Sequence, residues 1–323
     1  MTDVKYAIVT AADSKYFYSL VSLLESLLRS NNNERSTYVY DLGLQLWQRE
    51  FLNEVLPANF ICLNLPKDEE LFTGWNDPRN KDHYAWKPAA ISNSINGHRG
   101  IFWIDAGVVV TSNLTDLEHG IDIEGALLVK NENHLNLDWT SSFCANEMNV
   151  SRRELDSPQI MGNFFGMSLI HPSGKKLMSD WVTWCRIENV VKGDRKSHRH
   201  DQTVLSILAA RNELTLLNDS TFTGIGRFGK DFRQLANKGL VYIAHRRWLY
   251  LFPIELLKGK YRHLFLYTIR SIPEILRILR LRTIYRGRQT YAGEVYVMLR
   301  RYARSPGKSL HGRVFEGVRR WKK

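Results

Sequence analysis

Short apolar runs alternate with helical patterns along the first third of the chain. Runs typical of buried strands, rich in β-branched and aromatic residues, occur at Lys5–Ala12, Thr37–Leu44, Asn59–Leu65 and Gly100–Val110. Apolar residues at helical spacing, or a proline suited to a helix start, predict helices at Tyr16–Ser30, Gln48–Leu56 and Lys87–Ile95. Strands that alternate with helices favour an α/β fold with a mostly parallel sheet, which binds ligands at the carboxyl ends of its strands.

The pattern is more mixed beyond this region. Further strands are expected at Gly125–Val129, Gly162–Ile170 and Gly239–His245. Helices are expected at Gly174–Val191 and His200–Asn212. From about Phe252 onward, arginines interleave with apolar residues at helical spacing. The chain therefore divides into a body, residues 1–250, and a basic amphipathic helical extension, residues 251–323.

The charge distribution supports this division. The whole chain carries a formal net charge of +12, from 45 Lys+Arg and 33 Asp+Glu. Lys258–Lys323 holds 18 of the basic and 3 of the acidic residues, a net of +15, which leaves 27 basic and 30 acidic residues in Met1–Leu257, a net of −3. The extension is thus suited to a polyanion, either an anionic membrane surface or a nucleic acid.

Features of the chain as a whole favour a cytoplasmic protein. No stretch reaches the roughly 18 apolar residues of a membrane span, and the first residues show no signal-peptide core. The three cysteines, Cys62, Cys144 and Cys185, have no metal-site spacing and an odd count, so we interpret them as thiols in a reducing compartment.

Several polar residues stand where predicted strands end. Asp105 follows an apolar run and is suited to a metal ion or a sugar hydroxyl, or equally to a hydrogen-bonded strand end. Gly107, two residues later, permits a close backbone approach. Thr10, Ala11 and Ala12 leave room for a flat ligand after the first strand, and Asp13 either binds that ligand or caps the next helix.

A second group of polar residues lies in the later part of the body. Arg199, Asp201 and Gln202 belong to a dense polar cluster before an apolar helix, and we favour a functional role over helix capping alone. His245 ends a predicted strand and is either structural or a metal or phosphate ligand. The ammonium of Lys87 suits a diphosphate, although most lysines are solvated surface residues.

The order of these motifs resembles that of glycosyltransferases with the GT-A fold, most closely the family 8 type. "VTAADSKYFYSLVSLLESL", "YVYDLGL", "WIDAGVVV", "GNFFGMSLI", "HDQTVLSIL" and "YIAH" carry the resemblance, which covers roughly Lys5–Trp248. The chain is also similar to a branch of this group that shares "WKP", an Asp-Ala-small strand, "W..C" and "HRxDQ". The resemblance implies a GT-A (Rossmann-like) catalytic domain in residues 1–250.

The resemblance also implies a role for each matched residue. Thr10, Ala11, Ala12 and Asp13 would line the pocket for the base and ribose of a nucleotide-sugar, expected to be a UDP-sugar. Lys87 would lie near the diphosphate or sugar, and Asn163 would face the sugar or acceptor. Asp201 and Gln202 would lie by the anomeric carbon, with Arg199 among the residues that bind the donor. Asp105 and His245 would bind Mn²⁺ or Mg²⁺, which stabilises charge on the leaving diphosphate.

The chain departs from the family pattern at Gly107, where the family has a second carboxylate. Three alternatives follow: a metal site completed by water and phosphate, transfer without a metal assisted by basic residues such as Arg199, or an inactive relative. We favour the first two, because the Asp-Gln pair and the small-residue turn are both present.

The implied reaction moves a sugar from the nucleotide-sugar to a glycan, glycolipid or protein, with retention of configuration. The basic extension suggests a peripheral position on the inner face of the membrane and a lipid-linked acceptor, as in polysaccharide biosynthesis. Nucleic acid fits the charge but not the motifs. The alternative to an enzyme is a non-catalytic binding or scaffold protein that keeps the nucleotide-sugar fold.

Overall fold

The structure is a computed structural model that describes residues 6–65, 84–218, 223–225 and 242–244. Elements of the first half are β1 (Tyr6–Ala12), α1 (Phe17–Arg29), β2 (Thr37–Asp41), α2 (Leu46–Val55), β3 (Phe60–Asn64), α3 (Trp86–Asn93), β4 (Gly100–Ile104), β5 (Val108–Val110) and α4 (Thr115–Glu124). They are followed by β6 (Ala126–Leu135), a 3₁₀ turn (Asn136–Trp139), α5 (Ser142–Glu147), α6 (Arg152–Leu155), β7 (Pro158–Ile160), β8 (Phe164–Ser168), α7 (Pro172–Trp184), α8 (Glu188–Val191), α9 (Asp201–Arg211), β9 (Leu216–Leu217), β10 (Thr223–Ile225) and β11 (Tyr242–Ala244).

A central sheet of eight strands organises the described residues. Its order is β3-β2-β1-β4-β8-β6-β7, and β9 pairs with β6. Neighbours among β1 to β4 are parallel, whereas β8 runs antiparallel to both β4 and β6. The sequence predicts that β1 to β4 pair in parallel, because each is a short apolar run and helical patterns lie between them.

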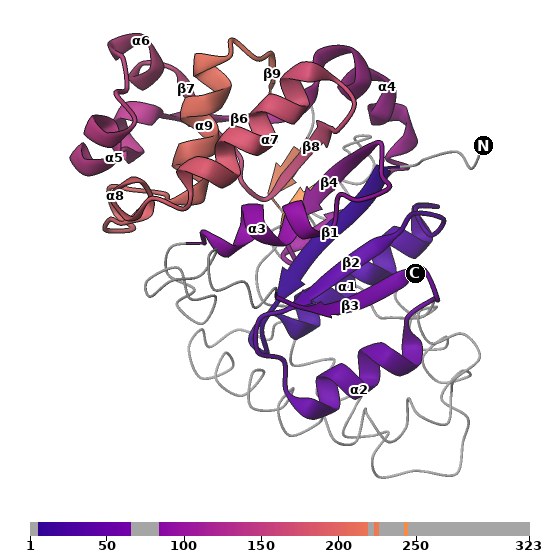
Figure 1. Cartoon of the computed structure of the whole chain (residues 1–323). Helices are drawn as coiled ribbons and strands as arrows, with labels where there is room; N and C mark the ends of the chain where they lie inside the picture. Colours follow the sequence, from indigo (N-terminus) through magenta and orange to yellow (C-terminus); the bar gives the residue numbers. More distant parts are fainter. Residues whose placement is uncertain (1–5, 66–83, 219–222, 226–241, 245–323) are drawn as a thin grey trace, which may run out of the picture. The chain divides into compact units, whose positions relative to one another are not determined.

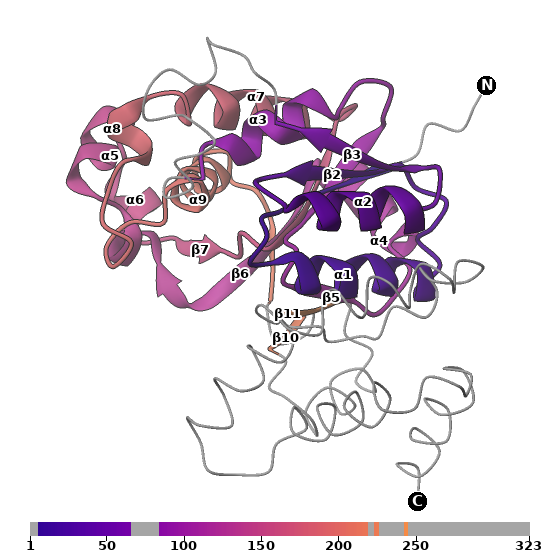
Figure 2. The same ribbon diagram turned by 90° about the horizontal axis from the view of Figure 1, so that it is seen from below.

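Helices cover both faces of this sheet (Figures 1 and 2). On one face α3, α7 and α9 bury Trp86, Trp181 and Leu205 against strand residues such as Trp103 and Phe165. On the other face lie α1 and α4, where Ile121 of α4 meets Gly166 of β8. The alternation of side chains along each strand thus supplies two apolar surfaces, one for each helical layer.

Two predicted elements are each divided in the structure. The single strand predicted over Gly100–Val110 is β4 and β5, because Val108 N donates to Asp105 O at 3.0 Å and closes a turn through Ala106 and Gly107. β5 leaves the central sheet and joins β10 and β11 in a second one. The single helix predicted over Gly174–Val191 is α7 and α8, because Ile187 has extended backbone angles.

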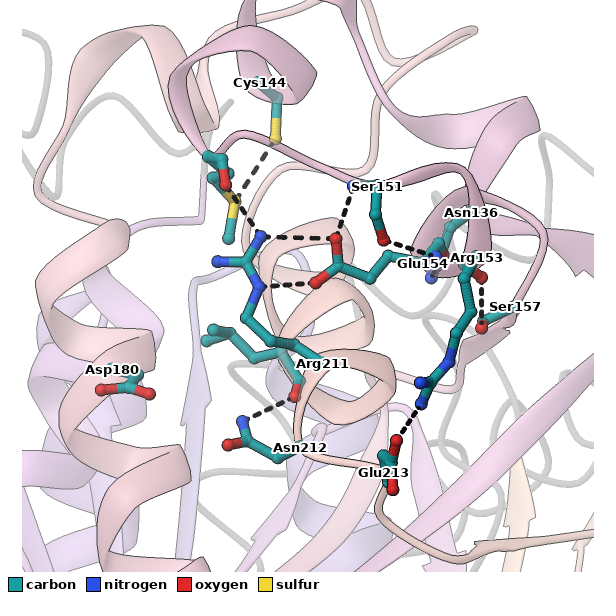
Figure 3. Close-up of polar contacts among 12 residues, drawn as sticks. Asn136, Cys144, Ser151, Arg153, Glu154, Ser157, Asp180, Arg211, Asn212 and Glu213 are labelled. Atoms are coloured by element: carbon teal, nitrogen blue, oxygen red, sulfur yellow. Dashed lines mark hydrogen bonds and ion pairs between the residues drawn. The ribbon is translucent and has the colours of Figure 1, made fainter.

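A largely buried ion pair joins the short helix α6 to the far end of α9 (Figure 3). Arg211 Nε, on α9, lies 2.5 Å from Glu154 Oε1 on α6, and Arg211 Nη2 donates to Met148 O at 2.8 Å. Ser151 N donates to Glu154 Oε2 at 2.6 Å, and Glu154 N donates to Ser151 Oγ at 3.3 Å, which caps the start of α6. The pKa of Glu154 is lowered, because Arg211 and Ser151 outweigh the effect of burial.

The three cysteines are unpaired, as predicted. Cys144 and Cys185 are buried and Cys62 is half-buried. Burial raises the pKa of all three thiols, to about 11 for Cys62 and about 12 for Cys144.

Candidate functional site

Strand direction brings Asp105 and Asn163 together at one edge of the sheet. Asp105 follows the carboxyl end of β4, and the antiparallel pairing of Ile104 with Phe164 places the start of β8 beside it. Asp105 N donates to Asn163 O at 2.9 Å. This edge is where the carboxyl ends of β1, β2 and β4 meet, so it is the expected ligand-binding edge of the fold.

Lys87 joins the two carboxylates that the sequence singled out. Its Nζ lies 3.4 Å from Asp105 Oδ1 and 3.5 Å from Asp201 Oδ2. Nζ also donates to the carbonyl of Gly162 at 3.0 Å. The side chains of Lys87 and Asp201 are only 7% and 5% exposed, whereas that of Asp105 is 40% exposed. The sequence predicted these residues one by one, and the structure makes them a connected group.

Burial and charge act in opposite directions on this group. Burial raises the pKa of Asp201 to about 6; Asp105 adds to this rise, and Lys87 counteracts it. Burial by itself would lower the pKa of Lys87, but Asp105 and Asp201 outweigh it and the pKa is raised. The ammonium is therefore charged at neutral pH, and Asp201 is a carboxylate that accepts a proton under mildly acidic conditions.

Trp103 is a site residue that the sequence analysis missed. Its Nε1 donates to Asp105 Oδ1 at 2.6 Å, and Lys87 Nζ lies 5.0 Å from the centre of its ring. Trp103 stands two residues before Asp105 on a strand, and this spacing places both side chains on the same face. The two-residue spacing between Trp103 and Asp105 is the sequence signal that identifies Trp103 as a site residue.

The start of α9 is fixed by neighbouring side chains. Trp181 Nε1 donates to Asp201 O at 3.0 Å, and Gln202 Nε2 donates to Ile160 O at 2.8 Å. A Cβ on Gly162 would lie 3.2 Å from the Gln202 side chain, so the backbone passes close to it. His200, directly before Asp201, has a φ of 52°, a strained backbone that costs on the order of 1–3 kcal/mol.

Two arginines of the polar cluster stack on aromatic rings. The guanidinium carbon of Arg199 lies 3.8 Å from the centre of the Trp139 ring, and that of Arg195 lies 5.4 Å from the Tyr84 ring. Arg199 N also donates to Thr203 Oγ1, which donates to Trp139 O. Trp139 and Tyr84 carry no sequence signal of this role, because each is distant along the chain from its arginine.

The turn after β1 contains the residues predicted to hold a base and ribose. Thr10, Ala11 and Ala12 are buried. Asp13 Oδ1 accepts from the backbone N–H groups of Lys15 and Tyr16, at 2.9 and 3.2 Å. Asp13 thus organises the turn into α1, and its contact with a nucleotide stays a prediction.

The described residues do not fit a divalent cation site. Among the residues whose positions the structure gives, no three His, Cys, Asp or Glu side chains gather where a metal ion could bind. Asp105 Oδ1 is engaged by Trp103 and Lys87, which leaves Oδ2, and Gly107 contributes no side-chain ligand. A Mg²⁺-like ion takes about six oxygen ligands in a near-octahedral arrangement.

Three sequence predictions fall outside the described residues. His245 follows the last residue of β11, and neither its side chain nor the boundary at residue 250/251 is described. The basic extension, residues 251–323, also lies outside them. Among the helices that are described, none has the length and apolar character needed to cross a membrane.

Comparison with known proteins identifies the fold. No protein-family model and no curated protein matches the chain. The chain is similar to the apo structure of the bifunctional glycosyltransferase WbbM, with 12% identity and a TM-score of 0.51; the match covers 76% of this chain but only 46% of WbbM. Similarity extends to the galactosyltransferase LgtC in complex with donor and acceptor sugar analogs (15% identity, TM-score 0.44, covering 74% and 87% of the two chains) and to mouse xyloside xylosyltransferase 1 (13%, 0.45, 75% and 98%). The WbbM likeness, taken with the sheet order and its helical layers, confirms the predicted GT-A fold.

Proposed function

We propose that the chain is a glycosyltransferase that moves a sugar from a nucleotide-diphosphate sugar, a UDP-sugar in the first instance, to a glycan, glycolipid or protein acceptor. The observation that carries the proposal is the pair of carboxylates, Asp105 and Asp201, which meet at Lys87 on the ligand-binding edge of a GT-A fold. A buried carboxylate with a raised pKa at a ligand-binding edge is typical of catalytic sites, which favours an enzyme over a scaffold protein.

The proposed reaction is a displacement at the anomeric carbon. The bond from this carbon to the phosphate oxygen breaks, and its electron pair leaves with the nucleoside diphosphate. The acceptor hydroxyl oxygen bonds to the same carbon on the face that the diphosphate leaves, so the configuration is retained, and its proton passes to an oxygen of the leaving diphosphate. The transition state resembles an oxocarbenium ion, so a carboxylate at the anomeric carbon stabilises it. We assign this role to Asp201, with Gln202 and Asn163 beside it.

The leaving diphosphate needs positive charge. We assign Arg199 to it, because stacking on Trp139 fixes the plane of a guanidinium whose N–H groups suit phosphate oxygens. The turn at Thr10–Asp13 is proposed to hold the base and ribose. No step is assigned to Mn²⁺ or Mg²⁺, because the described residues do not fit such an ion.

The proposal includes a cellular setting that follows from the sequence. A cytoplasmic enzyme with a basic extension of net charge +15 would act at the inner face of a membrane, on a lipid-linked acceptor in polysaccharide biosynthesis.

Nucleotide release from donor sugars tests the proposal. The purified full chain is incubated with a panel of UDP-sugars, with GDP-sugars for comparison, and the released nucleotide is measured. We expect release from at least one donor, and a loss of about a hundredfold in kcat for Asp201→Asn, the typical effect of removing one preorganised electrostatic group.

Asp156→Asn is the matched control. Asp156 directly follows α6, forms an exposed ion pair with Arg152, and its replacement removes one carboxylate without touching the site. Calorimetric titration with UDP and GDP accompanies the assay. If neither nucleotide binds and no donor is turned over, the proposed function is wrong and the scaffold alternative gains support.

A further inference from the structure

The ammonium of Lys87 occupies a position defined by three oxygens from three segments. Asp105 follows β4, Asp201 begins α9 and Gly162 precedes β8. Their oxygens lie 3.4, 3.5 and 3.0 Å from Nζ. In other sites, a bound metal ion joins separate segments of a chain through their oxygen atoms. Here the ammonium of Lys87 does the same.

The surroundings of Nζ keep it dry and charged. Its side chain is 7% exposed, and the rings of Trp103 and Tyr84 lie 5.0 and 6.0 Å away. Such rings stabilise a cation through their electron-rich faces. Since the two carboxylates hold its pKa above the ordinary value, Lys87 carries its charge throughout the neutral range.

The same geometry leaves little for a divalent cation. The space between Asp105 Oδ1 and Asp201 Oδ2 contains the ammonium, and the indole of Trp103 donates to the same Asp105 oxygen at 2.6 Å. At Gly107 the chain lacks the side chain that would add another oxygen. Among the residues that the structure describes, the donor set thus matches a resident ammonium and not a second, external cation.

We propose that Lys87 is the resident cation of this site, a positioning residue that holds Asp105 and Asp201 in place without a divalent metal ion. This inference rests on the proposed function, in which the two carboxylates lie on the edge of the sheet that binds the donor sugar. It follows that nucleotide binding is independent of Mn²⁺ and Mg²⁺.

Removal of the ammonium has a specific consequence. In Lys87→Met a side chain of similar length carries no charge, and two carboxylates and a carbonyl then face a position without a cation. That arrangement attracts a divalent ion. A purely structural lysine would change stability on replacement, but it would not create metal affinity.

Binding of Mn²⁺, followed by the loss of the free-ion paramagnetic resonance signal, provides the test. The full chain is measured without nucleotide as wild type, Lys87→Met, Lys87→Met/Asp105→Asn and the control Lys175→Met, which changes an exposed lysine on α7. We expect Mn²⁺ to bind Lys87→Met at least about tenfold more tightly than wild type, and the gain to vanish in the double variant. Lys87→Arg, which restores the charge, should bind as wild type does.

Two results would overturn the inference: stoichiometric Mn²⁺ binding by the wild type that Asp105→Asn abolishes, or a folded Lys87→Met that gains no affinity. Circular dichroism reports folding. If Lys87→Met does not fold, the test uses Mn²⁺ binding by the wild type and by Asp105→Asn, together with UDP titrations in Mn²⁺ and in chelator. Equal UDP affinity in Mn²⁺ and in chelator supports the inference. A tenfold loss of UDP affinity in chelator contradicts it. Absence of all nucleotide binding contradicts the proposed function alone, because the Mn²⁺ measurements use no nucleotide.

Discussion

At the scale of single residues, Asp201 departs from the ordinary chemistry of a carboxylate. It is 5% exposed, yet its nearest cation, Lys87, also serves Asp105. Burial therefore outweighs the attraction of Lys87, and the pKa of Asp201 rises from 3.8 to about 6. A raised pKa means that the folded protein binds a proton more tightly than the unfolded chain does, so ionisation of Asp201 costs stability.

The pH dependence of stability follows from this sign. Between about pH 4 and 6 the folded state keeps the proton that the unfolded state loses, so wild-type stability falls relative to Asp201→Asn as the pH rises through this window. We expect the unfolding free energy of the wild type, relative to that of Asp201→Asn, to fall by roughly 2–3 kcal/mol between pH 4 and pH 8. Urea unfolding at both pH values measures it. Asp156→Asn, with its half-exposed carboxylate, should show no comparable shift.

At the scale of elements, the far end of α9 holds α6 through one pair of side chains. Glu154 is 9% and Arg211 31% exposed, and both Glu154 oxygens face the guanidinium. A second pair in the same view, Arg153 and Glu213, is 68% and 69% exposed (Figure 3). The two ion pairs have similar chemistry and lie close together in the fold. A comparison of variants in each pair therefore separates the effect of burial on stability from that of charge.

Glu154→Gln should lower the free energy of unfolding by about 1–3 kcal/mol, because it breaks a largely buried pair and leaves Arg211 without its counter-charge. Glu213→Gln should change it by less than about 0.5 kcal/mol. Since the pKa of Glu154 is lowered, its stabilisation is present at neutral pH and is lost as the pH falls below the ordinary value of 4.5. Denaturant titrations at neutral and acidic pH measure both effects; equal losses for the two variants would contradict this account.

At the scale of the whole molecule, the sequence predicts the regular part of the fold well. β1 to β4 agree with their apolar runs, α1, α2 and α9 with apolar residues at helical spacing, and α3 with the proline near its start. The division at Ala106–Gly107 was missed, since the apolar run continues through the turn. The brief helices α5 and α6, each of a few residues, lack the length that a period needs.

The candidate site shows the same limit. Asp105 and Asp201 were predicted from their places at the end or start of an element, Lys87 from its charge and Asn163 from the family resemblance. Their grouping around one ammonium was not predicted, since it depends on how β4, β8, α3 and α9 meet in the fold. Trp139 and Tyr84 were missed for a similar reason: an aromatic residue becomes part of a site only through the arginine that folding places on it.

The basic extension supports a prediction for the intact chain. With a net of +15 on Lys258–Lys323, the full protein should sediment with vesicles containing anionic lipid at low salt and be released as salt rises. Vesicles of neutral lipid are the control. Equal binding to both kinds of vesicle, or binding to duplex nucleic acid without binding to anionic vesicles, would contradict a membrane role.

The central place of β1 has a consequence for synthesis of the chain. β1 leaves the ribosome before β2 and β4, but it lies between them in the sheet, and its register joins Tyr6 to Gly100. One edge of this apolar strand therefore has no native partner until β4 has emerged. An open strand edge is a template for wrong pairing. During translation, a chaperone that covers β1 until β4 has emerged would thus prevent such wrong pairing.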